Sequence, residues 1–340
     1  MIDNKIQIGP IDTIFLLGGG KIVSELIQRI NDDMSKTIKV ISSPRHLKEI
    51  HNDQSFADFL SKKNINYLSI ESMNDSKLKN FIKHNDNNFY LSIGAAWIFK
   101  KQHIDGLFHN KLLNLHSTRL PQNRGGGGFS WQILTKNRFG FCTIHMVDEG
   151  IDTGDIVFCN EFLYPAHCRI PSDYEKFYIP NNVNSIMKFI SLHEKKSNTI
   201  KLIKQTEYFS SYWPRLNTDL NSWIDWSIDY NHLETFICAF DDPYLGAKTY
   251  LNHKPVYLKK CMVNNQDGIF HSYQSGIIYR KTDKWLCVSA NGGGIIIEEV
   301  TNEKGESILE DIVVGDRFVT PHEKINESKL RVKYTSTGIK

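Results

Sequence analysis

Short apolar runs alternate with amphipathic segments over the first two hundred residues of the chain. Residues 11–20 (IDTIFLLGGG) predict a buried strand that ends in glycines, and residues 21–33 predict a helix with Ile22, Leu26 and Ile30 on one face. Further apolar runs predict strands at residues 37–43, 65–70, 89–96, 111–117, 139–149 and 155–164. Amphipathic or helix-forming segments predict helices at residues 55–64, 75–85, 98–106 and 181–197. Strands that alternate with helices indicate an α/β fold with a parallel sheet and right-handed crossovers.

The pattern changes in the second part of the chain. Residues 210–226 (SSYWPRLNTDLNSWIDW) predict an extended linker, and residues 231–240 predict a helix. Short strands of a small β-barrel are expected after this helix, at residues 254–263, 276–281, 285–290 and 293–300. Because 340 residues is long for one hydrophobic core, we expect an α/β domain over residues 1–204 and a smaller, OB-like β-barrel domain over residues 205–340.

Composition places the chain among ordinary soluble globular proteins, with 40% hydrophobic and 23% charged residues. No apolar run reaches 18 residues, so no membrane span is expected. The N-terminus has no basic stretch before its apolar segment, which predicts a first strand and not a signal peptide. The six cysteines form no C-x-x-C pair, which is typical of free thiols in a reducing cytoplasm.

Charge is distributed unevenly along the chain. Residues 205–340 carry 15 Lys and Arg against 18 Asp and Glu, a net charge of −3, whereas the first 204 residues carry 26 against 20, or +6. The positive balance of the first part would suit a phosphorylated small molecule. The second part lacks the basic stripe that a nucleic-acid-binding domain needs.

Two glycine clusters invite a phosphate-site interpretation. Gly18, Gly19 and Gly20 follow the first predicted strand, but Val23 stands where a dinucleotide fingerprint requires its third glycine. A tight strand-to-helix turn is the simpler prediction, although Ser and Arg after the second strand leave an NADP-type enzyme open. The four glycines at residues 125–128 indicate close approach of the backbone or mobility, with a hinge of no function as the alternative.

Asn114 and His116 lie two residues apart on a predicted strand, so both side chains point to the same side. They come at the carboxyl end of that strand, where open α/β folds bind ligands, and Asp152 follows the end of a later strand. An amide, an imidazole and a carboxylate suit acyl transfer to an amine, because a tetrahedral oxyanion needs donors and the amine needs a base. The alternative is that His116 and Asp152 only cap and pair within loops. The chain has no G-x-S-x-G elbow and no H-E-x-x-H motif, so neither an acyl-enzyme nor a metal site is expected.

Two linked motifs carry a resemblance to a known family. N-L-H-x-x-x-L-P-x-x-R-G at residues 114–125 and C-T-I-H-M-V-D-E-G-I-D-T-G-D-I-V at residues 142–157 are similar to the signature of folate-dependent formyltransferases. The resemblance covers residues 88–160 closely. It implies a Rossmann-like formyltransferase domain that uses N10-formyltetrahydrofolate as its formyl donor.

The resemblance also implies roles for individual residues. Asn114, His116 and Asp152 fall on the catalytic triad of the family, and Thr143 and His145 on neighbouring positions. The pterin-binding positions of the family correspond to Trp97, Ile98, Phe99, Glu149, Gly150 and Ile151. The implied reaction is direct attack of an amine on the formyl carbon, with Asn114 and a protonated His116 stabilising the oxyanion. We expect the carboxylate of Asp152 to raise the pKa of His116 above its ordinary value of about 6.5.

Motifs in the second part of the chain narrow the choice of acceptor amine. W-P-R at residues 213–215, I-D-W at 224–226 and P-x-x-G-A at 243–247 resemble the C-terminal domain of methionyl-tRNA formyltransferases, and two-domain sugar formyltransferases carry a comparable unit. The glycinamide ribonucleotide enzyme lacks this unit. The charge of −3 and the C-R-I-P segment at residues 168–171 favour the branch that acts on nucleotide-linked amino sugars.

We therefore expect an N-formyltransferase for a dTDP- or GDP-linked 4-amino-4,6-dideoxyhexose, in the synthesis of surface polysaccharide such as the O-antigen of lipopolysaccharide. Methionyl-tRNA formyltransferase is the alternative, and a non-catalytic nucleotide-binding or dehydrogenase-like protein is a third. Candidate contacts for the acceptor are Lys100, Arg119, Arg124 and Trp131. The aromatic cluster Tyr212, Trp213, Trp223 and Trp226 would stack a base or, more simply, pack between domains. A homodimer is compatible with an apolar second domain.

Overall fold

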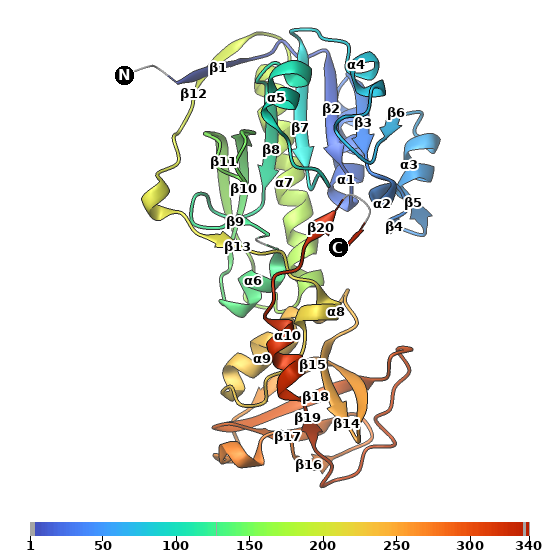
Figure 1. The fold of residues 1–340 in the computed structure, drawn as a ribbon, viewed down its shortest axis with the longest axis vertical. Helices are drawn as coiled ribbons and strands as arrows, with labels where there is room; N and C mark the ends of the chain where they lie inside the picture. The colour runs from blue at the N-terminus through green and yellow to red at the C-terminus, as the bar shows by residue number, and fades with distance from the viewer. Residues whose placement is uncertain (1–3, 127, 336–337, 340) are drawn as a thin grey trace.

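The protein has an α/β part and a β-rich part that lie one below the other along the long axis (Figure 1). The computed structural model describes residues 4–126, 128–335 and 338–339. The last described residues leave the β-rich part and run back to the α/β part (Figure 1). Among the described residues, none of the helices is both long and apolar enough to cross a membrane.

The α/β part is built on a seven-stranded sheet in the order β11-β10-β8-β7-β2-β3-β6. Its strands are β2 (Thr13–Gly18), β3 (Thr37–Ser42), β6 (Asn66–Ser69), β7 (Asn88–Ile93), β8 (Leu112–His116), β10 (Phe139–Met146) and β11 (Ile156–Leu163). The strands from β6 to β8 are parallel, as the sequence predicts, whereas β10 pairs antiparallel with β8 and with β11. The two antiparallel strands extend the sheet beside the strand that carries Asn114 and His116.

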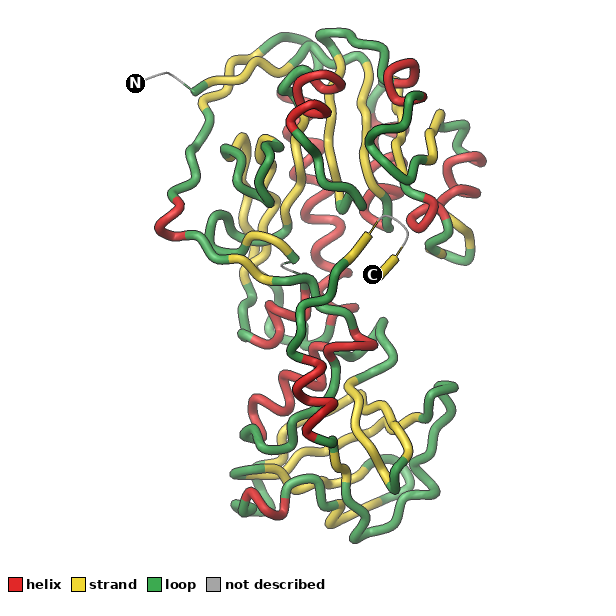
Figure 2. The backbone as a smooth tube through the Cα atoms, viewed as in Figure 1, coloured by secondary structure: helices red, strands yellow, loops and turns green. Residues whose placement is uncertain are grey.

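Helices cover both faces of this sheet (Figure 2). One face packs against α1 (Lys21–Asp33), α3 (Phe56–Lys62) and α7 (Pro171–His193), and the other against α4 (Lys77–Phe81) and α5 (Lys101–Phe108). Strand β2 shows the reason, since Ile14 and Leu16 belong to the first apolar cluster and Phe15 and Leu17 to the second. A strand that buries both sets of alternate side chains reads as a continuous apolar run.

The remaining elements of this part are short. They are α2 (Pro44–Leu47), α6 (Phe129–Leu134), β4 (Ile50–His51), β5 (Gln54–Ser55), β9 (Arg124–Gly125), and the antiparallel pair β1 (Lys5–Ile8) and β12 (Asn198–Lys201). The sequence predicted neither α6 nor β12. The last long helix was predicted to start at residue 181, whereas α7 starts ten residues earlier, at Pro171. The internal Pro180 of α7 hid the continuity of this helix, because proline ordinarily ends a helical pattern.

The β-rich part is a six-stranded antiparallel sheet in the order β16-β17-β18-β15-β14-β19. Its strands are β14 (Ala247–Leu251), β15 (Lys254–Asn264), β16 (Ile278–Lys281), β17 (Leu286–Ala290), β18 (Gly293–Thr301) and β19 (Phe318–Val319). A β-bridge from Ile277 to Arg317 joins the two ends of the sheet, which agrees with the predicted barrel. The flanking helices are α8 (Thr218–Asn221), α9 (Tyr230–Ala239), α10 (His322–Ser328) and the 3-10 turn at Ser272–Gln274, whereas the 3-10 turn at Glu207–Phe209 lies beside the α/β part, where Glu207 pairs with Arg124.

The two parts contact each other directly. Ser130 of α6 donates to the carbonyl of Ala239 at 2.7 Å, and the amide of Ser172 donates to the carbonyl of Asp242 at 2.8 Å. The placement of a domain boundary after residue 204 stays a prediction.

The connecting segment, residues 210–217, contacts the α/β part on one side and the last described residues on the other. Its strand β13 (Tyr212–Trp213) pairs in parallel with β9. The chain returns to this segment at β20 (Tyr334–Thr335), which pairs antiparallel with β21 (Gly338–Ile339), and the Tyr334 hydroxyl donates to the Leu216 carbonyl at 2.8 Å. Residues more than a hundred positions apart therefore meet at this segment.

Candidate active site

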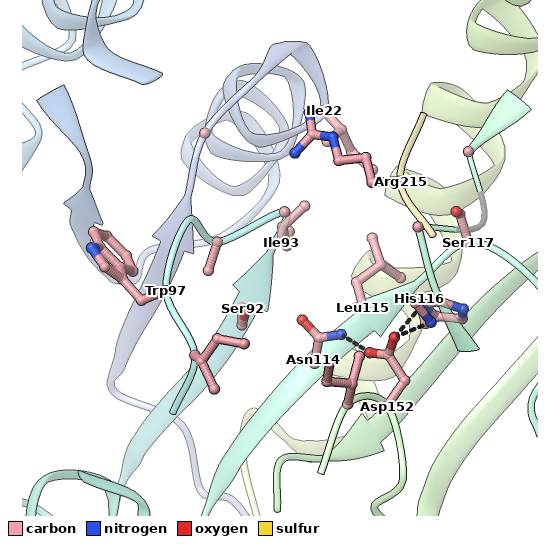
Figure 3. A pocket seen from close by; sticks show the side chains of 18 of the residues that line it. Ile22, Ser92, Ile93, Trp97, Asn114, Leu115, His116, Ser117, Asp152 and Arg215 are labelled. Carbon is pink, nitrogen blue, oxygen red and sulfur yellow. Dashed lines mark hydrogen bonds and ion pairs between the residues drawn. The ribbon is translucent and has the colours of Figure 1, made fainter. Parts of the chain in front are cut away.

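A cleft of about 620 Å³ opens at the carboxyl ends of β2, β7 and β8. This is the edge at which open α/β sheets bind ligands, because the loops after the parallel strands converge there. Asn114 and His116 at the end of β8 and Asp152 in the loop after β10 all line the cleft. Figure 3 shows these three side chains turned toward one another.

His116 is buried, and both of its ring nitrogens have partners. Its Nε2 lies 2.6 Å from the carbonyl oxygen of Asn123, and its Nδ1 lies 3.6 Å from Oδ2 of Asp152. Because a carbonyl only accepts, Nε2 carries a proton and donates it to Asn123. Nδ1 is therefore the nitrogen that faces the carboxylate and is available to take up a second proton.

His145 completes the group from strand β10. Asn114 Nδ2 lies 3.1 Å from His145 Nε2 and donates to Oδ1 of Asp152 at 3.4 Å, and His145 Nε2 lies 3.4 Å from the same carboxylate oxygen. The other ring nitrogen of His145 is 2.7 Å from the Met146 carbonyl. His145 also lines the cleft, although it is only 2% exposed, and it contacts both the amide of Asn114 and the carboxylate of Asp152.

The glycine segment approaches the carboxylate with its backbone. The amide of Gly125 donates to Oδ2 of Asp152 at 2.8 Å. Gly125 has a φ of 87°, and an added Cβ at Gly126 would come within 2.3 Å of the Arg215 Cα atom. Gly125 and Gly126 are thus needed because the chain passes here between Asp152 and the connecting segment, whereas Gly127 lies outside the described residues.

Burial and neighbouring charges determine the protonation states of Asp152 and His116. Burial opposes the ionisation of Asp152, but His116, His145 and the Gly125 amide outweigh it and lower the pKa of Asp152 to about 2. For His116 the expectation from sequence was wrong. Burial lowers the pKa of His116 below its ordinary value, and the opposing effects of Asp152 and the Asn123 carbonyl are smaller. The resting site therefore holds a carboxylate beside a neutral imidazole.

Five of the six positions matched to the pterin site line the cleft. Trp97, Ile98, Phe99, Gly150 and Ile151 line it, whereas Glu149 is not among the lining residues. Ile98 and Ile151 are exposed, at 66% and 41%. Exposed apolar side chains at the mouth of a cleft favour a flat, largely apolar ligand.

The predicted acceptor contacts are scattered. Trp131 lines the cleft and donates from its indole nitrogen to the Pro214 carbonyl at 2.8 Å. Lys100 and Arg119 do not line it. Arg124 is buried and turned away, with Nε donating to Gln205 at 3.1 Å and Nη1 donating to Glu207 at 2.7 Å.

The four aromatic residues of the predicted cluster divide between two places. The Trp213 ring lies 5.0 Å from that of Trp131, and Tyr212 accepts a hydrogen bond from Arg331 at 3.0 Å, both on the connecting segment. Trp223 stacks on Tyr250, and Trp226 stacks on Phe318 in the core of the β-rich part. Trp223 and Trp226 therefore pack within the β-rich part and are not available to a nucleotide base.

Comparison with known proteins identifies the family to which this chain belongs. Residues 13–167 match the family described as formyl transferase, and residues 218–315 match the formyl transferase C-terminal domain. The chain belongs to the formyltransferase family. The two matches take in the seven-stranded sheet, the cleft residues Asn114, His116 and Asp152, and most of the β-rich part.

Relatives within this family differ in their acceptors. The methionyl-tRNA formyltransferase of Finegoldia magna is 24% identical over 199 residues, which cover 57% of this chain and 63% of that enzyme. The match thus spans less than two thirds of the length of this curated relative.

Solved formyltransferase structures share the fold at low sequence identity. WlaRD, a sugar 3-N-formyltransferase crystallised with dTDP and 5-N-formyl-tetrahydrofolate, superposes with a TM-score of 0.61 at 20% identity and covers 85% of this chain and 98% of that one. An N-formyltransferase from Helicobacter canadensis, in complex with folinic acid and dTDP-3-aminofucose, gives a TM-score of 0.62 at 18% identity, with coverage of 86% and 100%.

The cleft of this formyltransferase also contains residues that sequence reasoning missed. Among the described lining residues, Arg215 is the one Lys or Arg, and His46, Glu49 and Tyr244 line the cleft near it. In Figure 3, Arg215 lies above Asn114, His116 and Asp152, and Trp97 lies away to the left. Arg215 stands in the W-P-R motif, which did carry a signal, but no pattern marks His46 or Tyr244 as neighbours of the cleft.

Proposed function

We propose that this protein transfers a formyl group from N10-formyltetrahydrofolate to the primary amine of a nucleotide-linked amino sugar. The observation that carries the proposal is that the Asn114–His116–Asp152 group shares one cleft with an apolar wall, formed by Trp97, Ile98, Phe99 and Ile151, and with Arg215, whose part of the cleft we call the cationic wall. An acyl donor on the apolar wall and a phosphorylated amine on the cationic wall would meet at this group.

The apolar wall suits the folate. A pterin ring is flat and needs an apolar surface with a few polar groups, which Ile98, Ile151 and the backbone around Gly150 would supply. Folate derivatives are bound in the two solved sugar enzymes of the same fold. The folate supplies the formyl group, and every other step uses residues of this chain.

The triad supports direct transfer. The amine attacks the formyl carbon, and the oxyanion that forms accepts a hydrogen bond from Asn114 Nδ2. Nδ1 of neutral His116 takes the proton that the attacking nitrogen loses, directly or through a water molecule, and Asp152 stabilises the imidazolium. Collapse of the intermediate breaks the bond from the formyl carbon to N10, and N10 receives a proton from the same relay.

The cationic wall suits a diphosphate. Arg215 lines it together with one carboxylate, that of Glu49, whereas Arg45 is not itself a lining residue. Burial and, after it, the charge of Arg215 lower the pKa of Arg45, so the two guanidinium groups oppose each other's charge. Arg45 Nε and His46 Nδ1 are buried without a hydrogen-bond partner among the described residues. A phosphate at this end would accept from such donors and relieve the repulsion. Gly19 beside His46 keeps the first glycine turn free of side chains.

Methionyl-tRNA remains the second candidate acceptor, favoured by the relative from Finegoldia magna. A tRNA enzyme requires an extended cationic surface, and residues 205–340 carry a net charge of −3. Sugar nucleotides, whose transfer products enter surface polysaccharides, are therefore the favoured acceptor class.

The test is a transfer assay that follows release of tetrahydrofolate. The acceptors are dTDP-, GDP- and UDP-linked 3-amino and 4-amino deoxyhexoses, with methionyl-tRNA as a parallel acceptor. We expect turnover with a dTDP- or GDP-linked 4-amino-4,6-dideoxyhexose and none with tRNA. Turnover with methionyl-tRNA alone would replace the proposed acceptor, and transfer to none of these acceptors would reject the proposed acceptor class.

Removal of one oxyanion donor should be visible in the same assay. Asn114→Ala should lose about 2.7–4 kcal/mol of transition-state stabilisation, which corresponds to a fall in kcat of roughly 100- to 1000-fold. Because Asn114 is half-buried beside the cleft and not in the core, folding should survive, which circular dichroism would check. Near-normal kcat in this variant would remove Asn114 from the mechanism.

A further inference from the structure

The main chain at Asp152 adopts an unusual conformation. Its φ is 55°, in the left-handed region that residues other than glycine seldom occupy. Two residues later, an added Cβ at Gly154 would lie 1.9 Å from the Met146 carbonyl oxygen. The carboxylate of the triad is thus carried by a tight turn whose conformation must be held by its surroundings.

Gln205 stabilises this turn with hydrogen bonds from outside the cleft. Its amide Nε2 donates to the main-chain carbonyl of Asp152 at 2.9 Å and to that of Gly154 at 2.7 Å. Its Oε1 accepts from Arg124 Nε at 3.1 Å. Gln205 is 8% exposed and does not line the cleft, so its side chain serves these three bonds and not a ligand.

The orientation of the Gln205 amide is determined by its partners. Carbonyl oxygens only accept and a guanidinium only donates, so Nε2 must face the turn and Oε1 must face Arg124. Both N–H donors of the amide are used, and a single side chain bridges the carbonyls on either side of Thr153.

The main chain beside Gln205 is itself fixed to strand β11. Ile203 and Ile156 exchange two backbone hydrogen bonds, at 2.8 and 2.9 Å. Arg124 also lies next to Gly125, whose amide donates to the Asp152 carboxylate. Arg124 and Gln205 therefore connect the main chain of Asp152 with the loop that binds its side chain.

We propose that Gln205, oriented by Arg124, is a positioning residue that holds the left-handed turn at Asp152 and so aims its carboxylate at His116. This inference rests on the proposed catalytic role of Asp152. It assigns Arg124 to the orientation of Gln205, in place of the substrate contact expected from sequence.

The substitution Gln205→Glu tests the proposal with almost no change in shape. A glutamate still accepts from Arg124, but it turns an acceptor toward the carbonyls of Asp152 and Gly154. We expect kcat to fall roughly 100-fold, as a small misplacement of a reacting group can cause, with the KM of the amino sugar within about twofold. Gln205→Asn, which is too short to reach both carbonyls, should lower kcat in the same direction.

The matched control is Gln132→Glu. Gln132 is also a buried glutamine, 4% exposed, whose Nε2 donates to one carbonyl, that of Phe139, at 2.8 Å. It is outside the triad and does not line the cleft. This variant should lose stability without the fall in kcat, which separates positioning from general destabilisation.

Hydrogen exchange gives a readout that does not depend on any acceptor. In Gln205→Glu, and in Gln205→Asn if the first variant does not fold, the Gly125 amide should exchange faster, because its acceptor on Asp152 moves. Unchanged exchange of Gly125 together with unchanged kcat would overturn the inference. If wild type transfers formyl to no acceptor, the proposed function fails, while the exchange result alone still decides whether Gln205 holds the turn.

Discussion

His116 is enclosed between the Asn123 carbonyl and the Asp152 carboxylate, and burial keeps its imidazole neutral at rest. The carboxylate makes the imidazolium less unfavourable than burial alone would. Removing it by Asp152→Asn should therefore lower the pKa of His116 further. A titration of the His116 ring by NMR would measure this shift, and a pKa that rises in the variant would contradict the arrangement described here.

His46 should make the stability of the protein depend on pH. Burial, together with Arg45 and Arg215, lowers its pKa to about 4, and Arg45 donates to its Nε2 at 2.9 Å. The unfolded chain, with an ordinary His pKa of about 6.5, takes up the proton more readily, so the free energy of unfolding falls as the pH drops below 6.5. Between pH 7 and pH 5 this one group should cost about 2 kcal/mol.

The variant His46→Gln isolates that contribution, because glutamine can accept from Arg45 but does not titrate. Urea unfolding of both proteins at pH 7 and pH 5 gives the comparison. A loss of stability that is the same in both proteins would assign the pH dependence to other groups.

At the scale of elements, the glycine loop and the connecting segment form one unit through the pairing of β9 with β13. Gly126→Ala would place a methyl group against the main chain of Arg215, at 2.3 Å from its Cα atom. We expect a loss of about 1–3 kcal/mol in the free energy of unfolding and a lower kcat, since Gly125 moves with the loop. Gly128→Ala is the control, because its added methyl group meets no atom closer than 3.9 Å. Equal behaviour of the two variants would contradict this packing.

The sequence predicted the elements that follow regular periodicities and missed those that depend on tertiary contacts. Strands β2, β7 and β8 are continuous apolar runs, and Asn114 and His116 could be placed because a strand has a period of two. Strand β12 has no apolar pattern and forms because Lys5–Ile8 pairs with it. Gln205 could not be found from sequence, because its partners lie up to 81 positions away along the chain and only the fold brings them together.

At the scale of the whole molecule, the end of the chain supports the cationic wall. The Arg215 guanidinium lies 4.6 Å from the centre of the Tyr334 ring, and Arg331 lies 5.1 Å from that of Tyr212. Tyr334→Ala should raise the KM of the sugar nucleotide roughly two- to fivefold, the value of one exposed cation–π contact, without changing folate affinity.

Tyr273→Ala is the matched control for this variant. Arg317 lies 5.4 Å from the centre of the Tyr273 ring, in the same kind of contact, and Tyr273 does not line the cleft. Steady-state kinetics with the acceptor varied would separate the two. An unchanged KM in Tyr334→Ala would show that Arg215 needs no support from the returning chain.

The contact between Arg331 and Tyr212 joins a late part of the chain to an earlier one. Arg331 follows Tyr212 by 119 positions, and Asn114, His116 and Asp152 come before Tyr212, so the ribosome adds these three residues long before Arg331 and Tyr334. On the proposed function, the acceptor side of the cleft is therefore the last part of the site to receive its supporting contacts.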